Sequence, residues 1–144
     1  MKIRMRLSLL FFSFLASAIA YSQSFEGEYI SHKTSFKDEI NSENSFIEET
    51  EFNIIIVPKT VEKEGVIIIH DPRIPKKNLI YSIVDFLGEL TDRQIKSYFF
   101  QCRSEHTNEQ ESMITLYLNE KENLSLMVSN NESSQVFFDL KPVR

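Results

Sequence analysis

The chain has 144 residues, with 21 Asp and Glu against 16 Lys and Arg, and its formal net charge is −5 at pH 7. An acidic balance argues against nucleic acid or an anionic membrane surface as a partner, because both bind cationic footprints. A single cysteine excludes an internal disulfide, and only three glycines argue against a glycine-rich phosphate loop.

Residues 1–20 have the three-part layout of a cleavable secretory signal peptide. Basic Lys2, Arg4 and Arg6 precede an apolar run over residues 7–16, and small residues end at Ala20. The alternative is a signal anchor, but a membrane span needs about 20 predominantly apolar residues and this stretch is shorter and interrupted by serines. Cleavage after Ala20 is therefore predicted.

Cleavage leaves residues 21–144, with 13 positive and 21 negative side chains and a net charge of −8. This length is enough for one domain with a packed core. The protein is expected to be exported to the periplasm or the cell exterior, with no stable membrane anchor after cleavage. Export without disulfides is more typical of bacterial proteins than of small secreted eukaryotic domains, so a bacterial source is favoured.

Short runs of β-branched and aromatic residues dominate the first half of the mature chain. Strands are predicted at 25–30, 46–61 and 66–70, separated by a polar loop or irregular strand at 33–45 and a hairpin connection at 62–65. Ile55 and Val57 interrupt the polar face of the second strand, which predicts cover on both of its faces. Residues 71–78 contain two prolines, which remove backbone donors, and are expected to form a surface loop.

The middle of the chain allows two interpretations. Residues 79–87 are predicted to form a strand, with a helix as the alternative, and Gly88 is expected to end it. Thr91 and Gln94 fit a capping box, which predicts one short helical turn near 91–96. A further strand is expected over 98–102.

The C-terminal third alternates apolar and polar residues in three runs separated by polar turns. The apolar members are Ile114, Leu116 and Leu118, then Leu124, Leu126 and Val128, then Val136, Phe138 and Leu140. The predicted fold is therefore all-β, a small antiparallel meander of seven to eight strands, barrel-like (lipocalin-like) or a sandwich.

His70 and Asp71 are the most interesting polar pair, because they end an apolar strand and open a proline-rich loop together with Arg73. Loops are where binding and catalytic side chains gather. Neighbours on a strand point to opposite faces, however, so the pair need not cooperate. The sequence nominates His70, Asp71 and Arg73 as candidate binding residues.

Aromatic residues form the second candidate group. A small β-barrel can hold one apolar ligand in its interior. The residues expected to line such a cavity are Phe52, Tyr81, Phe100, Tyr117 and Phe138.

Other candidate groups have simpler interpretations. The spacing of His32, His70 and His106 has no metal-binding pattern, so neither a metal site nor a cofactor is predicted. Cys102 with His106 could form a thiol nucleophile and base, but Cys102 shares strand parity with aromatic residues and is expected to be buried and inert. Acidic clusters such as 48–51 are interpreted as solvated strand faces.

Three hypotheses for function follow. The leading one is a non-enzymatic binding or structural module of the periplasm or cell exterior, which binds an envelope protein or another envelope component through its sheet edge or loops. The second is a carrier of a small hydrophobic ligand in a barrel cavity. The third is a hydrolase that uses His70 and Asp71.

Overall fold

The computed structural model describes residues 25–74, 76, 78–105 and 110–143. The predicted signal peptide and His106 lie outside the described residues. Ten antiparallel strands and one short 3-10 turn, η1 (Ser42–Asn44), are the regular elements of the described chain. The strands are β1 (Gly27–Ser31), β2 (Lys33–Asp38), β3 (Phe46–Glu48), β4 (Phe52–Val57), β5 (Gly65–His70), β6 (Asn78–Asp92), β7 (Ile95–Ser104), β8 (Glu111–Leu118), β9 (Leu124–Ser129) and β10 (Ser133–Pro142). The all-β prediction is confirmed.

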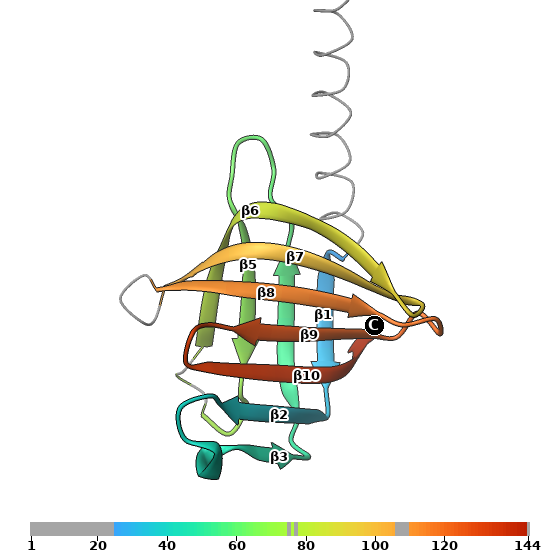
Figure 1. Ribbon diagram of the computed structural model, residues 1–144. Coiled ribbons are helices and arrows are strands. Elements are labelled where there is room, and N and C mark those ends of the chain that lie inside the picture. Colours follow the sequence, from blue (N-terminus) through green and yellow to red (C-terminus); the bar gives the residue numbers. More distant parts are fainter. Residues whose placement is uncertain (1–24, 75, 77, 106–109, 144) are drawn as a thin grey trace, which may run out of the picture.

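The sheet closes on itself to form an eight-stranded antiparallel barrel. The strand order runs β1, β4, β5, β6, β7, β8, β9 and β10, and β10 also pairs with β1 (Figure 1). Closure of this kind satisfies the backbone groups that an open sheet would leave at its edges. The barrel-like alternative is therefore confirmed over the sandwich.

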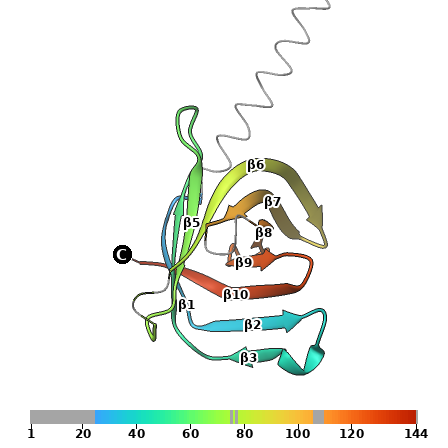
Figure 2. The ribbon, with the colours of Figure 1, turned by 90° about the vertical axis from the view of Figure 1, so that its left-hand side faces the viewer.

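β2 and β3 extend the barrel wall as a hairpin beyond the closed part (Figure 2). β2 follows β1 along the same partner: Tyr29 lies opposite Pro142, and Lys33 lies opposite Phe138, so both strands have the same register with β10. β3 pairs with β2 only. The segment 33–45, predicted as a loop or an irregular strand, thus contains β2 and η1.

Side chains at alternate positions along the strands fill the barrel interior. The buried residues come from every strand of the barrel, and three isoleucines, Ile54, Ile67 and Ile69, are at most 1% exposed. The core also contains Phe25, Tyr29, Phe52, Ile56, Tyr81, Ile83, Tyr98, Phe100, Cys102, Ile114, Leu116, Leu124, Leu126, Val128, Phe137 and Leu140. Period-two alternation therefore predicted the buried faces of β4, β8 and β9 correctly.

β10 departs from the predicted alternation. A bulge between Phe137 and Leu140, with Asp139 at φ 49°, changes the inward face from odd-numbered Phe137 to even-numbered Leu140. Phe137 is completely buried and packs edge-on against Phe52 at 5.1 Å between ring centroids, whereas Phe138 lies outside the core. The prediction that Val136 and Phe138 face inward with Leu140 is wrong for this reason.

The bulge is stabilised by a buried hydroxyl. Ser31 is 0% exposed, and its Oγ donates to the carbonyl oxygen of Phe138 at 2.8 Å and lies 3.0 Å from that of Lys33. Phe138 lies opposite Lys33, where β1 passes into β2, and the hydroxyl supplies its carbonyl with a donor that an apolar residue would lack.

Residues 91–96 form a hairpin rather than a helical turn. β6 continues through Gly88 to Asp92, and Arg93 and Gln94 have φ values of 48° and 69° before β7 begins. Two successive left-handed residues are typical of a type I′ turn, whose twist suits a two-residue hairpin. The predicted strand end at Gly88 is also wrong, because two bulges in β6 at 83/85 and 86/88 let the strand bend and continue.

We expect Phe137→Ala to lower the free energy of unfolding by about 3–5 kcal/mol, because it deletes a fully buried ring. The neighbouring Phe138→Ala should cost about 1 kcal/mol or less, because that ring lies outside the core. Urea denaturation of both variants measures the difference. Equal losses would contradict the bulge, since a regular strand would not separate the two rings in this way.

Candidate functional site

A pocket opens where the β2–β3 hairpin meets the loop that follows β5. We call it the seam pocket. Its volume is about 200 Å³, and it runs from the exposed edge of the hairpin to core residues of the barrel. It is lined by Phe46, Glu48, Phe52, Ile69, Asp71, Arg73, Ile74, Leu79 and Gln135.

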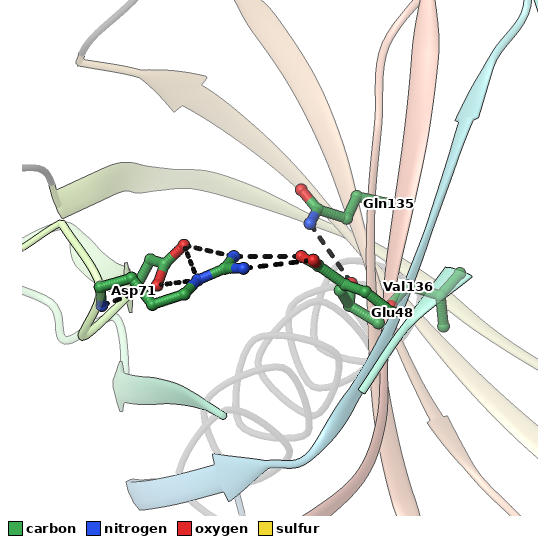
Figure 3. Close-up of polar contacts among 6 residues, drawn as sticks. Glu48, Asp71, Gln135 and Val136 are labelled. Carbon is green, nitrogen blue, oxygen red and sulfur yellow. Dashed lines mark hydrogen bonds and ion pairs between the residues drawn. The ribbon is translucent and has the colours of Figure 1, made fainter. Parts of the chain in front are cut away.

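Arg73 links the two sides of the seam pocket. Its guanidinium donates to both carboxylate oxygens of Glu48 on β3, at 3.1 and 3.2 Å, and to both oxygens of Asp71, at 2.7 to 3.2 Å (Figure 3). It also lies over the ring of Phe52, 5.7 Å from the centroid. A planar guanidinium is suited to such two-sided pairing, because its donors match carboxylate geometry.

The local sequence explains the position of Arg73. Asp71, Pro72, Arg73 and Ile74 form a turn in which the amide of Ile74 donates to the carbonyl of Asp71 at 3.0 Å. Proline at the second position sets φ for such a turn, and an Asp side chain commonly caps it from the first. Here Asp71 Oδ1 accepts from the amide of Arg73 at 3.0 Å. The predicted surface loop thus has a defined conformation at its start.

Asp71 and Arg73 are held in their charged forms. Side-chain hydrogen bonds from Arg73 are the main cause that lowers the pKa of Asp71, and hydrogen bonds to Asp71 and then to Glu48 raise the pKa of Arg73. A general base works best when its pKa lies near the working pH. An aspartate with a lowered pKa and an occupied carboxylate is therefore suited to ion pairing and poorly suited to proton transfer.

His70 does not join this network. Its Nδ1 lies 2.7 Å from Oδ1 of Asn78, on the adjacent strand β6. It lines a different cavity, which we call the outer groove, on the outside of β1, β4 and β5. The structure therefore separates His70 from Asp71 and Arg73, as expected for neighbours on a strand.

The outer groove has a volume of about 510 Å³ and an apolar floor. Ile30, Ile55 and Ile68 contribute to it, and the amide of Val143 donates to the carbonyl of Glu28 at its rim. Its other lining residues are Tyr29, Asn53, Ile54 and Asn78. The prediction that Ile55 and Val57 are covered on both faces is wrong: Ile55 lines this open groove and Val57 is 42% exposed.

The five aromatic candidates are divided between the inside and the outside of the barrel. Phe52, Tyr81 and Phe100 belong to the buried core, with exposures of 6%, 6% and 3%. Tyr117 and Phe138 lie outside it: the Tyr117 hydroxyl contacts Sδ of Met127 at 3.7 Å, and Lys33 lies over the Phe138 ring. They fall outside because Leu116 and Phe137 occupy the inward positions beside them.

The interior itself is filled. The cavity that reaches Phe100 has a volume of only about 10 Å³, which is about the space of one water molecule. It is lined by Phe25, Ile56, Pro58, Ile67, Ile83, Phe100 and Leu116. Burial raises the pKa of Tyr81 to about 12, as expected for a phenol inside this packed core.

Cys102 has the setting of an inert thiol. It is 0% exposed, and burial raises its pKa to about 12, so the thiolate form is disfavoured at neutral pH. Within the described residues, no three His, Cys, Asp or Glu side chains cluster in a way that could hold a metal ion. No helix in this part of the chain is long and apolar enough to cross a membrane.

Two polar residues of the seam pocket, Glu48 and Gln135, were not predicted. Glu48 belongs to the acidic run 48–51, which was expected to be a solvated strand face. Its ion pair with Arg73 becomes visible only in the folded chain, which brings β3 next to the loop after β5. Gln135 donates from Nε2 to Oγ1 of buried Thr34 at 3.3 Å, and Thr34 donates to the carbonyl of Val136 at 2.8 Å (Figure 3). No local signal in the sequence marks either contact.

Comparisons with known proteins do not assign the chain to a family. No protein-family model matches the chain, and neither curated protein sequences nor solved structures give a significant match.

We expect Arg73→Met to raise the pKa of Asp71 back toward its usual value, because the mutation removes the main group that lowers it. A carbon-detected NMR titration of the carboxyl measures this pKa. In the native protein the contribution of the pair to stability is present at neutral pH and is lost as the pH falls through the lowered pKa of Asp71. Lys37→Met, which removes an exposed pair with Glu39, is the control and should leave Asp71 unchanged.

Cys102 should not react with a thiol reagent such as DTNB at pH 8 while the protein is folded, because the thiol is buried and protonated. Full reaction is expected in 6 M guanidinium chloride. Rapid labelling of the folded protein would show that Cys102 is accessible and would contradict its inert role.

Proposed function

We propose that the mature chain is an exported, non-enzymatic binding module of the periplasm or cell exterior. Its partner is a protein or another component of the cell envelope, bound at the outer surface of the barrel. The basic, apolar and small-residue layout of residues 1–20 supports export. The net charge of −8 after cleavage supports a partner other than nucleic acid.

One observation carries the proposal: side chains fill the barrel, while cavities of about 200 and 510 Å³ open on its outside. A small-molecule site usually needs about 300–1,000 Å³ and buries most of its ligand. The interior cavity of about 10 Å³ cannot hold such a ligand without displacing core side chains. Recognition at the outer surface is therefore the better supported role.

The described polar groups also favour binding over catalysis. Asp71 and Glu48 pair with Arg73, His70 contacts Asn78, and Cys102 is buried. A hydrolase site needs a nucleophile and a base within hydrogen-bond reach of each other. His70 and Asp71, the pair on which the hydrolase hypothesis depends, have different partners.

The proposal is tested by mass spectrometry of the protein from the exported fraction of its own host. Cells are treated with a chemical cross-linker before gentle purification, and a second sample is analysed in the native state without cross-linking. We expect a cross-linked protein or envelope component and a native mass free of small molecules. A reproducible small-molecule adduct would favour the carrier hypothesis, and no cross-linked companion would contradict the proposal.

The same purification tests export. Under denaturing conditions the polypeptide should have the mass of residues 21–144. The mass of the full chain of 144 residues in the exported fraction would contradict cleavage after Ala20.

A further inference from the structure

β3 differs from every other described strand in having only one neighbour. The eight strands of the barrel each pair on both sides, and β2 lies between β10 and β3. β3 pairs with β2 through Phe46, Ile47 and Glu48, opposite Phe36, Ser35 and Thr34. In both views of the molecule β3 is the outermost strand of the sheet (Figures 1 and 2).

The second edge of β3 is a row of backbone donors and acceptors that lacks a partner strand. No backbone hydrogen bond between described residues joins residues 46–48 to a segment other than β2. An extended segment of another chain can bind to such an edge as an additional strand, held by main-chain hydrogen bonds. Among the described residues, the ion pair of Arg73 with Glu48 bridges the seam to the loop after β5.

The side chains on this edge are apolar and exposed. Ile47 is 71% exposed and Phe46 is 46% exposed, although both sit in a regular strand pair. The Phe46 ring stacks on Phe36 at 5.4 Å between centroids, which forms a flat apolar surface next to the open edge. Cross-strand contacts with apolar side chains stabilise a paired strand, so this edge offers packing in addition to hydrogen bonds.

The charged side chains of the chain segment that carries this edge are all acidic. Residues 38–58 contain six Asp and Glu and no Lys or Arg. Glu48 pairs with Arg73 and Glu51 lies 3.9 Å from His32, while neither Glu43 nor Glu49 forms an ion pair with a described residue. Basic side chains on a partner would therefore be attracted to this edge, and those of a second copy of the same acidic segment would be repelled.

We infer that the open edge of β3 is the docking site for an extended partner segment in which basic and apolar residues alternate. The segment adds to the sheet as a neighbour of β3, places apolar side chains beside Phe46 or Ile47, and pairs its cations with Glu49 and Glu51. This inference rests on the proposed function, because it names the surface and the partner chemistry of that binding module.

The test uses a decapeptide of alternating Lys and Val as the probe for residues 21–144 labelled with ¹⁵N. We expect saturable binding by calorimetry, with amide shifts centred on residues 46–51. A Glu and Val peptide of the same length should bind at least tenfold more weakly. The same loss is expected for a Lys and Val peptide that is N-methylated at alternate residues, because methylation removes the backbone donors of one edge.

A matched pair of charge reversals locates the site. Glu49→Lys with Glu51→Lys should weaken the Lys and Val peptide at least tenfold. Glu62→Lys with Glu120→Lys makes the same change of charge on exposed residues elsewhere and should leave affinity within about twofold. Unchanged binding after N-methylation, shifts centred on another surface, or no binding at millimolar peptide would each overturn the inference.

Cross-linking in the host separates this inference from the proposed function. If the companion of the native protein is retained by the Glu49→Lys, Glu51→Lys variant, the edge of β3 is not the docking site, although the binding module stands. If the native protein has no companion, the proposed function fails. Loss of the companion in this variant, but not in the Glu62→Lys, Glu120→Lys variant, supports the docking edge.

Discussion

The pairing of β10 with β1 and with β2 is the interaction on which the rest of the structure depends. It joins the first described strand to the last and converts a meander into a closed barrel. The pairing of β1 with β10 contains only two residue pairs. The adjacent bulge in β10 is stabilised by the hydrogen bond from the buried Ser31 hydroxyl to the carbonyl of Phe138. Without this closure, β1 and β10 would each expose an edge.

Closure also decides where recognition can occur. An eight-stranded barrel has an interior just wide enough to be filled by side chains or to hold one small ligand. In this chain large residues, among them Phe52, Phe100 and Phe137, occupy the inward positions. The packed interior leaves the outer surface, the seam pocket and the edge of β3 as the places that a partner can reach.

The seam pocket and the edge of β3 have a common origin. Between β3 and β4 the chain returns to the barrel wall: β3 pairs with β2 only, whereas β4 pairs with β1 and β5. The resulting gap is bridged by Arg73, whose two carboxylate partners come from opposite sides. This side-chain ion pair neutralises the charges on both sides of the gap but provides no backbone hydrogen bonds. The outer edge of β3 is therefore left without a partner strand among the described residues.

Much of the fold could be predicted from the sequence. Alternation identified the inward faces of β4, β8 and β9, and polar turns indicated a meander. Alternation failed at β10, and the predicted strand end at Gly88 in β6 was wrong, because a bulge depends on a partner strand and changes which side of a strand is buried. The helical turn expected at 91–96 failed for a similar reason: a capping box and a hairpin turn share polar residues, and the long pairing of β6 with β7 selects the hairpin.

Less of the candidate site could be predicted. Asp71 and Arg73 were found from the sequence because a proline-containing turn after an apolar strand is a local signal. Glu48 was not, because its partner lies 25 residues away and no pattern relates the two positions. The sequence by itself determined the strands, their polar turns and the acidic charge, all of which follow from neighbouring residues. Only the tertiary structure decided that the barrel closes, that its interior is filled and that β3 keeps a free edge, because each of these depends on contacts between distant segments.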